Sequence, residues 1–165
     1  MARRARAAKV TGPRRRGTLR VFVAGTFDGL HYGHVFLLRY ARTRAGRLAR
    51  RLGCTSVHLS VVIARDDSVR RIKNRPPHHT QRERQRLVAS LRMVDEAFVG
   101  YRDDFLRSVR RVNPDLIVLG YDQSRAWEQV LRSAGFMCPV VRCPEYRRRR
   151  LKSSMIRADL EKMRT

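Results

Sequence analysis

Two histidines stand three residues apart in the glycine-rich segment 25–34, whose sequence is GTFDGLHYGH. Residues three apart share one face of a helical turn, so His31 and His34 would lie together where a helix begins. Two imidazoles on that face can donate hydrogen bonds to phosphate oxygens as negative charge builds on a leaving pyrophosphate. The glycines permit tight turns and a close approach of the backbone to a ligand. The segment therefore predicts a phosphate-binding loop.

Two other interpretations of this segment stay open. A histidine near the start of a helix is often only a cap or a surface residue. Asp28, His31 and His34 are also residue types that bind metal ions. The three glycines and the position between a strand and a helix favour phosphate over metal.

The apolar pattern around the segment predicts the elements that position it. Residues 19–24 form a short apolar run rich in β-branched side chains, which is typical of a buried strand. Apolar residues then recur at steps of three and four from Val35 to Leu52, which predicts a helix ending at Gly53. The positive amino end of that helix, with its unpaired N–H groups, would attract phosphate.

Strands and helices alternate along the rest of the chain. Strands are expected at 57–64, 96–99, 116–119 and 139–142, and helices after Thr80 and at 104–112, 124–134 and 153–163. The polar residues 65–80, with two prolines, are expected to form a long loop. This order predicts an α/β fold, a Rossmann-like doubly wound parallel sheet, in a single domain over residues 19–165. Such a sheet binds its ligand at the carboxyl ends of the strands.

The chain is strongly basic, with 38 Lys and Arg, 14 Asp and Glu, and a net charge of +24. This charge indicates either an anionic partner or an arginine-rich background composition. Residues 1–18 are arginine-rich and free of acids, so we expect a flexible basic tail, the one region where nucleic acid would bind. A nucleic-acid-binding protein is therefore the alternative from another functional class. An aromatic content of only 7% argues against it, since no stacking platform is visible.

Cysteines and hydropathy bear on the location of the protein. Cys54, Cys138 and Cys143 form no regular disulfide framework, which is typical of a reducing, cytoplasmic setting. No apolar run approaches the ~18 residues of a membrane span.

The segment GTFDGLHYGH resembles the nucleotide-binding loop of the cytidylyltransferase-like family, the HxGH nucleotidyltransferases. Further segments follow in the family's order: ARD at 64–66, KNRPP at 73–77, ER at 83–84, VDE at 94–96, LIVLGYDQ at 116–123 and KSSMIR at 152–157. The resemblance covers about residues 19–160. Within the family, the chain is most similar to the archaeal-type enzymes that adenylylate FMN. Cytidylyltransferases that act on glycerol 3-phosphate or a similar phospho-alcohol are the closest alternative.

The resemblance implies an adenylyltransferase that transfers AMP from ATP to FMN to give FAD and pyrophosphate. It implies that His31, His34 and Lys73 act on the phosphates. It also implies nucleotide contacts from Thr26, Phe27, Tyr32, Gly33, Arg84, Asp122, Tyr146, Ser153 and Ser154. Mg²⁺ or another divalent metal is expected to arrive with ATP, without a protein-only metal site, and a homodimer is suggested.

Several of these residues have an alternative structural role. Phe27 would pack in the core, Arg84 would form a surface ion pair with Glu83 or a nearby acid, and Ser153 and Ser154 would cap a helix. A second functional role for Arg84 would be to support a dimer interface. A flavin ring also needs a flat apolar or aromatic pocket, and six aromatic residues are available for it: Phe36, Tyr40, Tyr101, Phe105, Tyr121 and Trp127.

Overall fold

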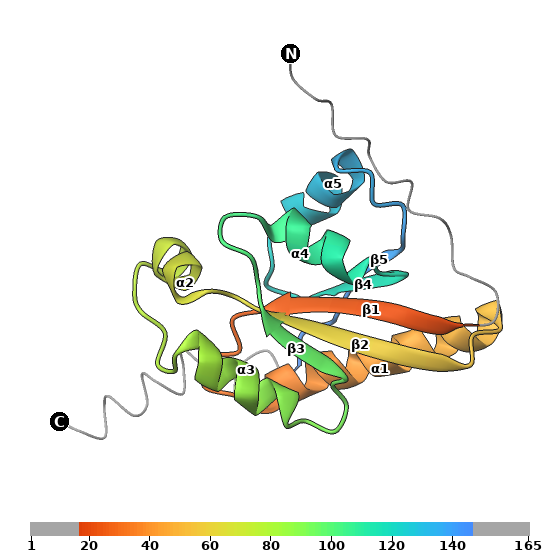
Figure 1. Cartoon of the computed structure of the whole chain (residues 1–165), viewed down its shortest axis with the longest axis horizontal. Helices are drawn as coiled ribbons and strands as arrows, with labels where there is room; N and C mark the ends of the chain where they lie inside the picture. Colours follow the sequence, from red (N-terminus) through yellow and green to blue (C-terminus); the bar gives the residue numbers. More distant parts are fainter. Residues whose placement is uncertain (1–16, 147–165) are drawn as a thin grey trace, which may run out of the picture.

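A five-stranded parallel sheet lies at the centre of the structure, a computed structural model that describes residues 17–146 (Figure 1). Its order is β3-β2-β1-β4-β5, and every neighbouring pair is parallel. The strands are β1 (Thr18–Gly25), β2 (Ser56–Ile63), β3 (Glu96–Val99), β4 (Leu116–Leu119) and β5 (Val140–Arg142). The predicted strands are thus all present. The first one begins at Thr18, inside the range that we expected to belong to the tail.

Helices cover both faces of the sheet, as the doubly wound prediction requires (Figure 1). Helices α1 (Tyr32–Leu52) and α3 (Gln81–Ala89) lie on one face, and α4 (Phe105–Val112) and α5 (Ala126–Ser133) lie on the other. Successive residues of a strand point to opposite faces. Val21 and Val23 of β1 accordingly pack toward α1, whereas Phe22 and Ala24 pack toward α4 and α5.

The strand order fixes where a ligand can bind. The chain runs outward from β1 through β2 to β3, and then returns to the other side of β1 to form β4 and β5. The crossover reverses direction between β1 and β4, which pair from Val21 with Leu116 to Val23 with Val118. A crevice forms at the carboxyl ends of strands at such a switch point. The loop after β1 and the loop after β4 therefore face the same site.

The prediction of a long loop over residues 65–80 is wrong, because this range contains helix α2 (Asp66–Lys73). Acids at Asp66 and Asp67 sit in its first turn and basic residues occupy its last turn, which suits the helix dipole. The helix ends at Asn74 in the left-handed conformation, with φ at 51°. Val69 is its only buried residue, so no apolar periodicity marks the helix in the sequence.

The predicted helix ends are largely confirmed. Helix α1 ends at Gly53 in the left-handed conformation, and α3 begins with the capping box of Thr80 and Glu83. Asp104 caps α4. The predicted helix at 153–163 lies outside the described residues, and within residues 17–146 no helix is long and apolar enough to cross a membrane.

Candidate active site

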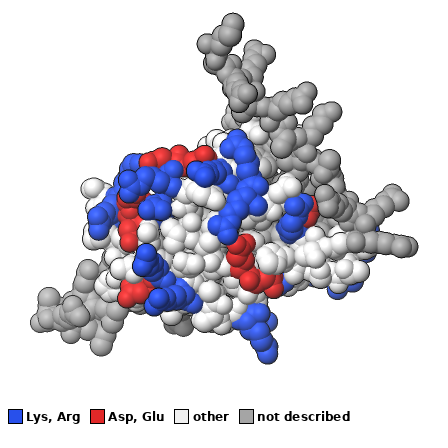
Figure 2. Space-filling view, viewed as in Figure 1, with Lys and Arg blue, Asp and Glu red and all other residues white. Residues whose placement is uncertain are grey.

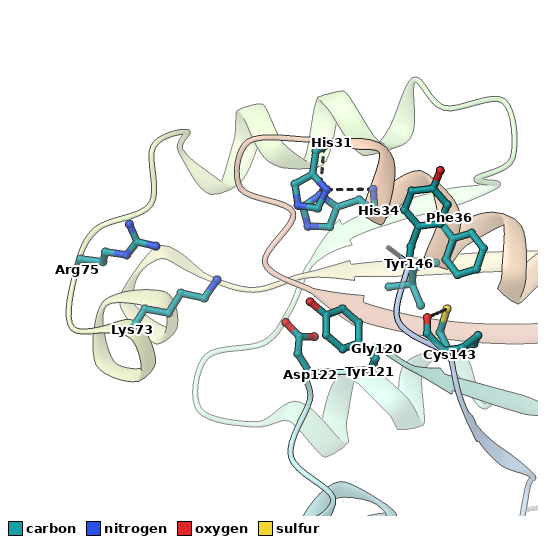
Figure 3. Close-up of a pocket in the computed structure, with 13 residues that line it drawn as sticks. His31, His34, Phe36, Lys73, Arg75, Gly120, Tyr121, Asp122, Cys143 and Tyr146 are labelled. Carbon is teal, nitrogen blue, oxygen red and sulfur yellow. Dashed lines mark hydrogen bonds between the residues drawn. The ribbon is translucent and has the colours of Figure 1, made fainter. Parts of the chain in front are cut away.

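A pocket of about 420 Å³ opens at the carboxyl edge of the sheet, at the switch point (Figure 3). This volume falls in the usual range for small-molecule sites. Four parts of the chain meet there: the start of α1, the end of α2, the loop after β4 and the segment after β5. The lining residues are His31, Gly33, His34, Phe36, Leu37, Lys73, Arg75, Gly120, Tyr121, Asp122, Cys143, Pro144 and Tyr146.

The two imidazoles lie together, as the spacing predicted. The rings of His31 and His34 stack with their centroids 4.0 Å apart and 29° between their planes. The Gly33 N–H donates to Nδ1 of His31 at 3.1 Å, and the His31 N–H donates to Nδ1 of His34 at 3.4 Å (Figure 3). A neutral imidazole that accepts at Nδ1 carries its proton on Nε2. Each ring therefore presents one Nε2–H donor, which is what a phosphate oxygen requires.

Three backbone amides in the first turn of α1, those of Gly33, His34 and Val35, differ from our expectation. They are not free to bind phosphate, because the N–H groups of His34 and Val35 donate to the His31 carbonyl at 3.0 and 3.3 Å. The Gly33 N–H is taken by the His31 ring. The imidazoles thus replace these amides as hydrogen-bond donors at the positive end of the helix.

Both histidines are held neutral. Burial lowers the pKa of His34 to about 3, with help from the nearby charges of His31 and Lys73 and against the opposing effect of Asp28. Burial also lowers the pKa of His31, against the opposing charge of Asp122. The rings therefore act near neutral pH as hydrogen-bond donors and not as cations. Positive charge in the pocket comes from Lys73 and Arg75. Lys73 was among the predicted site residues, and Arg75 was not.

Asp28 fastens the segment between α2 and α3 to the loop after β1. The residue is only 7% exposed, and its Oδ1 accepts hydrogen bonds from the backbone N–H groups of His78 at 2.8 Å and His79 at 3.1 Å. The structure thus gives Asp28 a role in positioning the loop. Neither the metal nor the phosphate interpretation of the segment had included this role.

Arg84 has a different role from the predicted one. Its side chain is completely buried, so the guanidinium reaches neither a nucleotide in the pocket nor a partner subunit. It donates to the carbonyl of Thr26 at 2.6 Å, to Oδ1 of Asp66 at 2.6 Å and to the carbonyl of His79 at 3.0 Å. One buried cation therefore connects the nucleotide loop with the start of α2 and the segment before α3.

The side chain of Phe27 packs in the core and does not line the pocket. The ring is 1% exposed and lies 5.2 Å from the ring of His34, behind the imidazole pair. Its backbone φ of 54° turns the chain sharply, and a Cβ on Gly25 would come within 2.9 Å of the Phe27 ring. Only the backbone of Phe27 is left for the predicted nucleotide contact. Tyr32 also lies off the pocket lining, 5.0 Å from the ring of Tyr146.

The loop after β4 is held by the side chains of Gln123 and Arg142, for which the sequence predicted no role. Gln123 accepts from the Gly120 N–H at 2.8 Å and donates to the Ala24 carbonyl at 3.0 Å. Arg142 donates to the carbonyls of Gly120 at 2.8 Å and Gln123 at 2.6 Å. These bonds fix the loop that carries Asp122 into the pocket, where it is exposed and faces the imidazole pair (Figure 3).

An apolar wall forms the remaining side of the pocket. The ring of Tyr146 lies 4.9 Å from that of Phe36, and Leu37, Cys143 and Pro144 adjoin them. Of the other aromatic candidates, Tyr121 lines the pocket, whereas Phe105 and Trp127 pack 4.2 Å apart against the opposite face of the sheet. The predicted serines Ser153 and Ser154 lie outside the described residues.

The fold and the site together define an α/β protein of the HxGH nucleotidyltransferase class. The chain belongs to the cytidylyltransferase-like family, whose model matches residues 22–159. This finding confirms the resemblance seen in the sequence.

The curated relatives to which the chain is similar include FAD synthases. The chain is 40% identical to the FAD synthase of Aciduliprofundum boonei over 131 residues, which cover 78% of this chain and 80% of that protein. It is also 40% identical to the FAD synthase of Methanopyrus kandleri over 139 residues, 82% of this chain and 87% of that one. Among solved structures, the lipopolysaccharide core biosynthesis protein from Thermoplasma volcanium is similar, with a TM-score of 0.66 and 30% identity. That match covers 78% of this chain and 98% of that chain.

Proposed function

We propose that this chain is an FMN adenylyltransferase, which transfers AMP from ATP to FMN and releases FAD and pyrophosphate. One observation carries the proposal: two neutral imidazoles present Nε2–H donors in a pocket at the switch point of the sheet. The curated FAD synthases at 34–40% identity supply the choice of substrates.

The chemistry needs no covalent intermediate on the protein. A phosphate oxygen of FMN forms a bond to the α-phosphorus of ATP, and the bond from that phosphorus to the bridging oxygen breaks as pyrophosphate leaves. Catalysis is then positioning and charge stabilisation. The Nε2–H groups of His31 and His34 donate to the phosphate oxygens, and Lys73 and Arg75 neutralise the charge of the leaving pyrophosphate.

The two substrates need different walls of the pocket. The aromatic and apolar side formed by Phe36 and Tyr146 suits a flat ring system. Asp122, in the loop after β4, is proposed to accept a hydrogen bond from a ribose hydroxyl. The backbone of Thr26 and Phe27 is proposed to contact the nucleotide on the other side.

A divalent cation such as Mg²⁺ is proposed to enter with ATP, where it would neutralise the triphosphate charge. Mg²⁺ keeps several waters and needs only one or two protein carboxylates. Asp122 is a pocket carboxylate that fits this need. Within the part of the chain that the structure describes, no three His, Cys, Asp or Glu side chains gather into a metal site, so ATP itself would supply most ligands.

A grid of nucleotides and acceptors tests the proposal. ATP or CTP is combined with FMN or glycerol 3-phosphate, and pyrophosphate release is measured in each combination. Turnover is expected with ATP and FMN. Turnover only with glycerol 3-phosphate would show that the flavin assignment is wrong, and nucleic-acid binding with no turnover in any combination would refute the enzyme. A homodimer is also proposed, and sedimentation of the purified protein measures it.

A further inference from the structure

Helix α1 carries a basic outer face that the proposed reaction does not use. The helix contains six arginines and no acid. Its inner side packs on the sheet through Leu38, Ala41, Ala45 and Ala49, which are buried. Five of the arginines are exposed and none of them lines the pocket, and we call them the α1 arginine face: Arg39, Arg44, Arg47, Arg50 and Arg51.

The charges of this face have no acidic partners in the described chain. Arg42, on the edge of the helix, pairs with Asp95, but no ion pair among the described residues includes a member of the α1 arginine face. Other surface arginines lie beside acids, as with Arg71 and Asp103, and Figure 2 shows such mixed charge on the face in view.

The uncompensated charges weaken the helix that carries them. Arg47 lies three residues from both Arg44 and Arg50 and four residues from Arg51. Like charges at these spacings are neighbours on a helix surface and repel each other. An anion bound on this face would relieve these repulsions.

We propose that the α1 arginine face binds the phosphate backbone of a nucleic acid. At about 1.5 Å of rise per residue, Arg39 to Arg51 spans about 18 Å. A duplex presents one charge per ~1.7 Å of its axis, so several phosphates lie within reach of this row. The guanidinium group donates in a planar fork that matches phosphate oxygens.

The chemistry of the face favours nucleic acid over a membrane. A helix that binds at a lipid surface inserts an apolar side, whereas the apolar side of α1 is buried against the sheet. The expected nucleic-acid contact had been residues 1–18, of which residues 1–16 contain seven Lys and Arg and no acid. Residues 1–16 join the chain at Gly17, which accepts a hydrogen bond from Thr55 just beyond the end of α1. The test must therefore separate the two basic regions.

Two variants of the full chain separate the contribution of the α1 arginine face from that of the basic tail. Both variants lose the same amount of charge. One carries Arg44→Gln, Arg47→Gln and Arg51→Gln, and the matched control carries Arg14→Gln, Arg15→Gln and Arg16→Gln. Binding is measured by fluorescence anisotropy with a labelled duplex of about 20 base pairs, as DNA and as RNA, over a series of salt concentrations. The helix variant is expected to bind about tenfold or more weakly, and its salt dependence should fall by roughly one unit of slope for each lost phosphate contact.

The remaining outcomes decide against the proposal. Unchanged affinity and slope in the helix variant would overturn it, and so would a loss in the control variant as large as in the helix variant. Tight binding to vesicles containing phosphatidylserine, with no binding to either duplex, would assign the face to membranes instead. Pyrophosphate release with ATP and FMN is expected to stay unchanged in both variants, so a failure of this proposal is distinct from a failure of the proposed enzyme function.

Discussion

The guanidinium of Arg84 lies 2.6 Å from the carbonyl oxygen of Thr26, so a buried side chain of α3 holds the start of the loop after β1. The two residues are 58 positions apart in the chain. The same guanidinium holds Asp66 at the start of α2, the helix whose last residue is Lys73. Arg84 therefore connects the loop that leads to the imidazoles with the helix that ends in Lys73.

Replacing Arg84 with methionine should destabilise the protein strongly. The substitution keeps much of the buried volume but leaves Asp66 and two carbonyls without their donor. Removing one partner of a buried ion pair typically costs about 3–5 kcal/mol in the free energy of unfolding. Urea denaturation measures the loss, and Arg82→Met, an exposed change on the same helix, should stay within about 0.5 kcal/mol of the native protein. Equal losses in both variants would contradict the role of Arg84.

Replacing Asp28 with alanine should loosen the segment between α2 and α3. The variant loses the acceptor of the His78 and His79 amides, and two unsatisfied donors cost about 1–3 kcal/mol. Trypsin should then cleave after Lys73 roughly tenfold faster, because about 1.4 kcal/mol of easier local opening corresponds to a factor of ten. Asp28→Asn keeps an acceptor oxygen and should be cleaved nearly as slowly as the native protein. Equal cleavage of Asp28→Ala and the native chain would be evidence against the tether.

The elements that could be predicted from the sequence are those whose local pattern of apolar and polar residues determines their structure. Strands β3 and β4 begin and end at the predicted residues, because a short buried strand is a continuous apolar run between polar turns. The imidazole pair was also predictable, since a spacing of three residues on a helix start is enough to bring the rings together. Helix α2 was not, because it buries a single residue and depends on charge placement at its two ends.

The parts that the sequence hides depend on distant contacts. Gln123 donates a hydrogen bond to the Ala24 carbonyl across 99 positions. The segment LIVLGYDQ includes Gln123, but no local pattern shows which distant carbonyl its side chain binds. An arginine suggests phosphate when it is read alone, yet Arg84 is buried and satisfied by three partners from separate segments. Arg75 belongs to the basic segment KNRPP, which the sequence analysis had identified by its resemblance to the family. That segment could have suggested Arg75 as a further residue of the pocket at the switch point.

The assignment of the His34 protons predicts different effects for two amide substitutions. An asparagine side chain places an oxygen near the Nδ1 position but has no donor at the Nε2 position. His34→Asn should therefore preserve the hydrogen bond from the His31 N–H and lose the donor to phosphate. The loss of one such donor lowers kcat by about 100- to 1000-fold. His34→Gln can place its amide nitrogen near Nε2 and should retain more activity. Pyrophosphate release with ATP and FMN measures both variants.

The reverse ranking would contradict this tautomer. If His34→Asn were the more active variant, the catalytic contact would be at the Nδ1 side, and the ring would have to turn in the complex. Thermal unfolding of both variants close to that of the native protein would show that the comparison concerns chemistry and not folding.

The low pKa of His34 predicts that stability falls as the solution becomes acidic. Burial lowers this pKa from an ordinary value of 6.5 to about 3 in the folded protein. Below pH 6.5 the unfolded chain therefore takes up a proton that the folded chain excludes until about pH 3. The contribution is fully present above pH 6.5 and is lost progressively as the pH falls toward 3.

Comparison with His34→Gln isolates this contribution, because glutamine does not titrate. Between about pH 6.5 and 5, where most carboxylates are still ionised, the free energy of unfolding of the native protein should fall relative to the variant. The slope should approach about 1.4 kcal/mol per pH unit, the value for one proton. Urea denaturation at several pH values gives both curves. Parallel curves would mean that the folded protein accepts the proton on His34, and the neutral imidazole pair on which the proposed chemistry depends would have to be abandoned.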